Sequence, residues 1–225
     1  MIALCTGTNP DLYQRQGVKI IPFPMIRLER IAFSEQMAKS FVDKLRAASM
    51  ILFTSRFTVK FFFETLSKAG YAVDQATYGA KAVIAIGSVT ARALRDAGWK
   101  ISLTADEETS QGVYQGLMDN FRLSGQEILF PRSALPNPYL KTRLTEAGAR
   151  VEEVALYTNT KPPRRPLPTE PIDAVIFTSP STVTNFLRDY QTIPSEWVIF
   201  SRGPLTAAAL RRGGYDSTDV KGVFQ

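Results

Sequence analysis

One long internal repeat constrains the fold of this chain more than any other feature. Residues 50–66 read MILFTSRFTVKFFFETL, and residues 174–190 read AVIFTSPSTVTNFLRDY. The Phe-Thr-Ser triplet recurs at a separation of 124 residues, from Ser55 to Ser179, and four apolar positions recur with it at the spacing of one helix face. A repeat of this length indicates two similar domains rather than a solenoid of short units. Two similar domains would form a cleft, and each would bring the same Thr-Ser element to it.

A second element follows each copy of the first. Residues 86–98 match residues 202–214 at a separation of 116 residues. A looser third pair relates residues 128–157 to residues 2–23, and both read strand, Asn-Pro, short helix, glycine, strand. The three elements therefore occur twice, in the same order, along the chain.

Short and continuous apolar runs precede the repeated turns. Met50–Phe53 and Ala174–Phe177 come before the Thr-Ser turns, and similar runs lie at 82–86 and 197–200. Such runs are typical of strands buried on both faces of a parallel sheet. Each leads into a helical pattern, and Ser88 is placed to cap the helix that follows it. The sequence therefore predicts an α/β fold with open parallel sheets.

Composition limits the chemistry that the chain can perform. Its 225 residues include no histidine, which excludes histidine triads and nearly every common zinc site, so we expect no metal and no cofactor. The single cysteine, Cys5, cannot form an internal disulfide and fits a reducing cytoplasm. We expect a cytoplasmic protein without membrane association, because no apolar run spans a bilayer and the N-terminus lacks signal-peptide features. A net charge of +6 favours anionic partners, but scattered Lys and Arg residues and the lack of known motifs argue against nucleic acid.

Hydroxyl side chains gather at the predicted strand-to-helix turns. In an open parallel sheet these turns line a crevice at the carboxyl ends of the strands. Free N–H groups at a helix N-terminus, together with a hydroxyl, can bind a carboxylate or phosphate. For each residue the alternative is an N-cap that contacts no ligand. The candidate ligand-binding residues at these turns are Thr54, Ser55, Ser88, Thr90, Thr178, Ser179 and Thr206.

A proline-rich stretch marks the clearest domain boundary. Residues 158–171 hold five of the fourteen prolines and should form a stiff, extended connection. A second crossing is expected near residues 23–29. The repeat order alone would suggest two tandem domains split near residue 125, but the position of the proline-rich stretch argues against that split. Tyr157 ends a predicted strand at this junction, so it is either a phenol that reaches the cleft or a packed strand residue.

Six motifs follow one another along the chain: Phe53-Thr54-Ser55, Ile86 to Gly98, Leu129-Phe130-Pro131, Leu156-Tyr157-Thr158, Phe177-Thr178-Ser179-Pro180-Ser181 and Gly203 to Leu210. This ordered set resembles the uroporphyrinogen-III synthase family over nearly the whole chain. The resemblance implies two flavodoxin-like parallel-sheet domains joined by two linkers, with the first domain discontinuous. The first domain would comprise residues 1–26 and 168–225, and the second would comprise residues 27–167, including the linkers. The resemblance also implies a cofactor-free lyase that cyclises the linear tetrapyrrole hydroxymethylbilane, inverts ring D and loses water to give uroporphyrinogen III in haem biosynthesis.

The same resemblance implies the roles of particular residues. Tyr157 would help the substrate hydroxyl to depart, and Arg132, Ser133 and Ser181 would bind substrate beside the hydroxyl residues of the turns. We expect the enzyme to be a monomer that binds neither nucleic acid nor membrane.

Three features depart from the family pattern. Thr6-Gly7-Thr8-Asn9 replaces a common arginine, Leu135-Pro136-Asn137-Pro138 replaces a common basic residue, and the chain ends at Gln225, where many members continue into a helix. The alternative function is a non-catalytic two-domain module that binds a polycarboxylate or another anionic ligand. A nucleic-acid-binding protein is the third possibility, and it predicts strongly salt-dependent affinity.

Overall fold

The computed structural model describes residues 1–135 and 138–224. Pro136 and Asn137, which belong to the second predicted Asn-Pro element and to the departure at 135–138, lie outside the described residues, as does Gln225. The chain forms two compact units. Unit 1 comprises Met1–Leu28 and Asn159–Gln225, and unit 2 comprises Glu29–Thr158.

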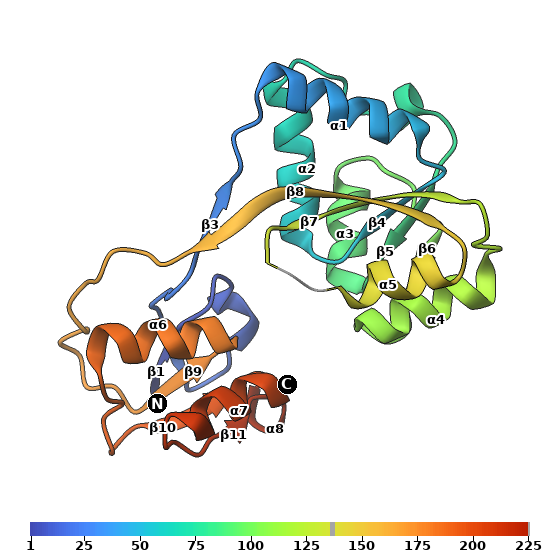
Figure 1. Ribbon diagram of the computed structural model, residues 1–225. Helices are drawn as coiled ribbons and strands as arrows, with labels where there is room; N and C mark the ends of the chain where they lie inside the picture. The colour runs from blue at the N-terminus through green and yellow to red at the C-terminus, as the bar shows by residue number, and fades with distance from the viewer. Residues whose placement is uncertain (136–137, 225) are drawn as a thin grey trace. The chain divides into compact units, whose positions relative to one another are not determined.

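The chain passes between the units inside two strands. It leaves unit 1 within β3 (Arg27–Arg30) and returns within β8 (Arg150–Thr160), and these strands are neighbours at one end of a sheet (Figure 1). The chain returns to unit 1 between Thr158 and Asn159, within β8. The domain bounds given by the sequence, 26/27 and 167/168, remain a prediction.

Unit 1 is a parallel sheet covered on both faces. Its elements are β1 (Ile2–Cys5), the 3-10 helix η1 (Pro10–Tyr13), β2 (Lys19–Pro22), β9 (Ala174–Phe177), α6 (Pro180–Tyr190), β10 (Val198–Ser201), α7 (Pro204–Arg212), β11 (Thr218–Asp219) and α8 (Lys221–Phe224). The strand order is β11-β10-β9-β1-β2. Numbered within the unit this is 2-1-3-4-5, the flavodoxin-like order. One face packs on α6 and α7 through Phe186 and Leu210, and the other packs on η1 and α8 through Tyr13 and Phe224.

Unit 2 repeats this architecture with a different starting strand. Its elements besides β3 and β8 are α1 (Glu35–Ala47), β4 (Met50–Phe53), α2 (Arg56–Lys68), the 3-10 helix η2 (Ala76–Tyr78), β5 (Ala82–Ala85), α3 (Ser88–Asp96), β6 (Leu103–Thr104), α4 (Ser110–Asn120), β7 (Glu127–Ser133) and α5 (Tyr139–Glu146). The strand order is β3-β8-β7-β4-β5-β6. If counting starts at β7, the order of β8-β7-β4-β5-β6 is again 2-1-3-4-5. Unit 2 is therefore a circular permutation of unit 1.

The apolar runs of the sequence form the central strands of both sheets. All four residues of β4 and all four of β9 are buried, because helices cover both faces of each sheet. In unit 2, Phe53 and Phe62 meet Trp99 edge to face on the side of α2, and Leu144 of α5 packs on the other side. The predicted α/β fold with two flavodoxin-like parallel-sheet units is confirmed. Within the described residues, no helix combines the length and the apolar character needed to cross a membrane.

Candidate functional site

The repeated Thr-Ser turns lie at the switch point of each sheet. A switch point is the place where neighbouring parallel strands connect onward in opposite directions, which opens a crevice beyond their carboxyl ends. In unit 1 it lies between β1 and β9, and in unit 2 between β7 and β4. Thr54 and Ser55 follow β4, and Thr178 and Ser179 follow β9. The topology thus puts the predicted binding turns where open α/β sheets bind ligands.

Ser55 and Ser179 are also helix caps. The Ser55 Oγ accepts the N–H of Phe57 at 3.1 Å at the start of α2. The Ser179 Oγ accepts the N–H of Thr182 at 3.4 Å in a capping box and lies 2.9 Å from the Ser181 Oγ. Capping occupies a lone pair of a hydroxyl oxygen and leaves its proton able to donate to an anion. The capping and binding interpretations are therefore compatible for these serines.

Thr178 is packed against the turn that follows β1. A Cβ atom added to Gly7 would lie 2.4 Å from the Thr178 Oγ1 and 2.6 Å from its Cγ2, so only glycine fits there without movement. Gly7 is buried and Thr178 is half-buried. This contact explains the glycine of the Thr6–Asn9 segment and brings the ends of β1 and β9 together.

The turn between β5 and α3 differs from the prediction. Gly87, rather than Ser88, is the N-cap of α3, and it makes no side-chain cap. The Glu108 carboxylate accepts both the Ser88 N–H at 2.8 Å and the Ser88 Oγ–H at 2.9 Å. Glu108 is therefore not simply a solvated charge, since it occupies the N-terminus of α3. Thr90 is buried in the first turn of α3, with 4% of its surface exposed.

The equivalent turn of unit 1, between β10 and α7, has no acidic cap. Gly203 precedes the helix with φ of 80°, a left-handed conformation that suits glycine, and Pro204 occupies the first turn. Thr206 is 2% exposed, and its Oγ1 donates to the carbonyl of Arg202 at 2.9 Å. The hydroxyl of Thr206 thus forms its hydrogen bond within the turn, whereas the side chain of Arg202 is exposed.

Arg132 lies at the end of β7 as predicted, but its guanidinium already has partners. It pairs with the Glu153 carboxylate of β8 at 2.5 Å and donates to the carbonyl of Leu135. Lys141 of α5 also lies 3.3 Å from Glu153. The side chains of Arg132 and Glu153 are only 14% and 21% exposed. The sequence did not predict this pair, because its two members lie on different strands and twenty-one residues apart.

Tyr157 and Ser133 are brought together by the strand register. They pair directly across β7 and β8, after an irregularity between Arg132 and Ser133. The Tyr157 ring is 6% exposed and stacks on Phe61 of α2, with ring centroids 4.8 Å apart and planes at 23°. Tyr157 is thus a packed strand residue at the carboxyl end of the sheet, and a catalytic role for its hydroxyl remains a prediction.

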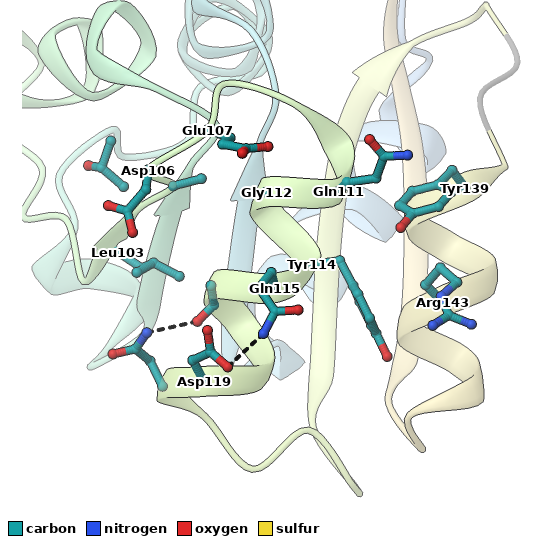
Figure 2. A pocket seen from close by; sticks show the side chains of 14 residues that line it. Leu103, Asp106, Glu107, Gln111, Gly112, Tyr114, Gln115, Asp119, Tyr139 and Arg143 are labelled. Carbon is teal, nitrogen blue, oxygen red and sulfur yellow. Dashed lines mark hydrogen bonds between the residues drawn. The ribbon is translucent and has the colours of Figure 1, made fainter.

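A pocket of about 500 Å³ in unit 2 lies outside this set of turns (Figure 2). Asp106, Glu107 and Asp119 line it, and its one lining guanidinium, that of Arg143, pairs with Glu146 at 2.8 Å. Such an acidic lining repels a polycarboxylate, so the pocket is not part of the candidate site. Within residues 1–135 and 138–224, no three His, Cys, Asp or Glu side chains form a group able to hold a metal ion.

Comparison with known proteins identifies a family for nearly the whole chain. The family model described as "Uroporphyrinogen-III synthase HemD" matches residues 10–218. No curated protein matches the chain.

Solved structures of low sequence identity share the fold. A mutant uroporphyrinogen III synthase from the extremely thermophilic bacterium Thermus thermophilus is 18% identical, with 97% of this chain and 91% of that chain covered and a TM-score of 0.62. Uroporphyrinogen-III synthetase from Helicobacter pylori is 16% identical, with 96% and 91% covered and a TM-score of 0.62. A second Thermus thermophilus structure is 19% identical, with 97% and 92% covered and a TM-score of 0.51. At this level of identity these likenesses support the two-domain α/β architecture.

Proposed function

The chain belongs to the uroporphyrinogen-III synthase family, a family of cyclising lyases of tetrapyrrole biosynthesis, and we propose that it converts hydroxymethylbilane to uroporphyrinogen III. The match to the family model over residues 10–218 carries this conclusion. The arrangement of the fold supports it, because the hydroxyl-bearing turns of both units lie at the carboxyl ends of the strands.

The chemistry suits the residues that the chain offers. A hydroxymethylpyrrole loses its hydroxyl readily, because the lone pair of the pyrrole nitrogen stabilises the cation that forms. The C–O bond breaks, the hydroxyl leaves as water after it takes up a proton, and a pyrrole carbon then attacks the cation and later loses a proton. The protein must mainly hold a flexible chain so that the correct carbon attacks. Hydroxyls, cations and helix N-termini are sufficient for this task.

The proposed substrate-binding residues lie at the carboxyl end of the sheet to which each belongs. Thr54, Ser55 and Ser133 belong to unit 2, and Thr178, Ser179 and Ser181 belong to unit 1. The substrate carries eight carboxylates, which suits these hydroxyl donors and helix N-termini. Thr90 and Thr206, which are buried, and Arg132, which is paired with Glu153, fit a role in shaping these turns better than direct contact.

We propose that Tyr157 assists departure of the substrate hydroxyl by donating a hydrogen bond or a proton. A phenol hydroxyl carries a proton that it can donate in a hydrogen bond. General acid catalysis contributes roughly 10²–10⁴-fold, and the lower end is expected because this substrate ionises easily. Tyr157→Phe should therefore slow formation of the type III isomer while the stack on Phe61 and the fold persist. Turnover equal to that of the wild type would make the phenol purely structural.

The isomer ratio of the product tests the function itself. Purified protein is added to freshly generated hydroxymethylbilane, which closes spontaneously to the type I isomer. The proposal predicts an excess of the type III isomer that grows with enzyme concentration. Type I as the sole product at high enzyme concentration would contradict it, and tetrapyrrole binding without turnover would favour the non-catalytic binding module.

Paired substitution of the two capping serines separates binding from chemistry. Ser55→Ala combined with Ser179→Ala should raise KM more than it lowers kcat, because the serines contact substrate rather than the departing hydroxyl. Each change also removes a cap worth about 1 kcal/mol, so folding is checked by thermal unfolding of the same samples. A lowered kcat at unchanged KM would place these serines in the chemical step instead.

We also propose that the enzyme works as a monomer in the cytoplasm. The chain has one cysteine, which is buried and unpaired, and this composition suits a reducing compartment. Light scattering of the purified protein would test the first part, because a dimer has twice the mass of the 25.0 kDa chain. Fractionation of the producing cells would test the second.

A further inference from the structure

Two equivalent turns of the repeat carry opposite charges. The turn before α3 and the turn before α7 occupy matching positions of the two sheets, and Ile86-Gly87-Ser88 aligns with Arg202-Gly203-Pro204. The start of α3 already holds the carboxylate of Glu108, which accepts two hydrogen bonds from Ser88. The start of α7 has no side-chain cap and is preceded by Arg202. A helix N-terminus attracts negative charge, so only the start of α7 is open to an anion from outside the chain.

The backbone holds Arg202 in place while its side chain is exposed. The Arg202 N–H donates to the carbonyl of Phe177, and its own carbonyl accepts the Thr206 hydroxyl, both at 2.9 Å. Asp219 lies beside Ser201 in the β10–β11 register and accepts the N–H of Lys221 at 2.8 Å. Within the part of the chain that the structure describes, the Arg202 guanidinium makes no ion pair.

A buried phenol whose proton has no acceptor lies next to this arginine. Tyr13 of η1 is 4% exposed, and its hydroxyl finds no hydrogen-bond acceptor within the described residues. Its ring is fixed edge to face against Phe224, with centroids 5.9 Å apart. Burial raises the pKa of Tyr13, while the charge of Arg202 and a contact from its guanidinium to the hydroxyl oxygen oppose that rise. The phenol remains protonated at neutral pH, and its proton lacks an acceptor.

An unsatisfied buried donor beside an unpaired cation points to a missing anion. Burying a polar group without a partner is unfavourable, so a bound acceptor would stabilise this arrangement. A carboxylate fits both groups, because its two oxygens can accept from the guanidinium fork and from a hydroxyl together. The exposed arginine side chain can rotate when a ligand binds, and this rotation would give the ligand access to the Tyr13 hydroxyl.

We propose that Arg202 binds a carboxylate of the tetrapyrrole at the start of α7, with the Tyr13 hydroxyl as the second donor. The start of α3 does not bind a substrate carboxylate, because Glu108 occupies it. This inference rests on the proposed function for the identity of the ligand. It makes Arg202 a determinant of substrate affinity. It also gives different roles to two turns that are alike in sequence, because only the turn before α7 binds a substrate carboxylate.

The test compares substitutions of two exposed arginines, one just before α7 and one in its last turn. Arg202→Gln should raise KM for hydroxymethylbilane about tenfold with kcat within twofold of the wild type, as expected for an exposed charge-assisted contact. The control is Arg211→Gln, which removes the same charge at the far end of α7 and should leave KM within twofold. Tyr13→Phe should raise KM about threefold without lowering the melting temperature, because it removes an unsatisfied group. Equal KM values for the Arg202 and Arg211 variants would overturn the proposal.

A second measurement keeps the site testable apart from turnover. Benzenehexacarboxylate serves as a rigid polycarboxylate probe, and calorimetry gives its Kd for the wild type and for both arginine variants. Weaker binding only in Arg202→Gln supports the site, and equal Kd values overturn it. If the wild type forms only the type I isomer, the proposed function fails, and the calorimetric comparison still decides whether Arg202 binds carboxylate.

Discussion

Breaking the ion pair between Arg132 and Glu153 should destabilise unit 2 more than it impairs catalysis. Removing one partner from a fully buried pair costs roughly 3–5 kcal/mol, because the other charge is left uncompensated. Here the side chains are 14% and 21% exposed, and Lys141 remains 3.3 Å from the Glu153 carboxylate. We therefore expect Arg132→Met to cost about 2 kcal/mol, below that range.

A double-mutant cycle measures the pair itself. Glu153→Gln alone should cost about 1–2 kcal/mol, and Arg132→Met combined with Glu153→Gln should cost less than the sum, with a coupling of about 1 kcal/mol. Urea unfolding is followed through Trp99, which is 2% exposed in unit 2, in a background in which Trp197 of unit 1 is replaced by Phe. Arg132→Met should leave KM within threefold of the wild type. A loss of unfolding free energy below about 0.5 kcal/mol, together with a large rise in KM, would show instead that Arg132 binds substrate.

Three further substitutions test other contacts. Glu108→Gln should destabilise unit 2 by about 0.5–1 kcal/mol at low salt and by less at high salt. The reason is that it removes the negative charge at the N-terminus of α3. A loss of stability in urea unfolding that does not depend on salt would contradict this interpretation. Gly7→Ala should cost about 1–3 kcal/mol in thermal unfolding, and adding Thr178→Ala should restore part of it. Burial raises the pKa of Cys5 from 9.0 to about 11, so the folded state keeps the thiol proton that the unfolded chain releases. Stability should therefore fall by about 2 kcal/mol from pH 9 to 11, and a Cys5→Ala variant with the same fall would rule out the thiol as its cause.

The sequence predicted the fold well where burial on both faces determines residue type. The run Met50–Phe53 became β4 and Ala174–Phe177 became β9 with the same limits, because a central parallel strand needs apolar side chains on each face. The serines after these strands cap their helices as expected, since an N-cap depends on local backbone geometry. The flavodoxin-like strand order, by contrast, was implied only by the family resemblance.

The side-chain contacts of the candidate site were less predictable. Glu108 reaches Ser88 across twenty residues, and Arg132 reaches Glu153 across twenty-one. Each contact depends on strand register and on the side of the sheet to which a residue points, which local patterns do not encode. Both acids belong to Glu-Glu pairs, Glu107-Glu108 and Glu152-Glu153, and nothing in the pairs themselves indicates which partner each carboxylate finds. The sequence therefore located the turns correctly but could not tell which polar groups there were already paired.

The permuted strand order also has a consequence for folding during synthesis. Unit 2 is built from one continuous stretch, so all its strands have left the ribosome before unit 1 can be completed. The central strand β1 pairs with β9, where Ala3 aligns with Ala174, so the first apolar segment made must wait for most of the translation time. Until then its backbone edge and its buried Leu4 have no native neighbour on that side, which is the kind of exposure that promotes aggregation. Unit 1 is therefore the part of the molecule whose yield should depend most on chaperones and on the speed of elongation.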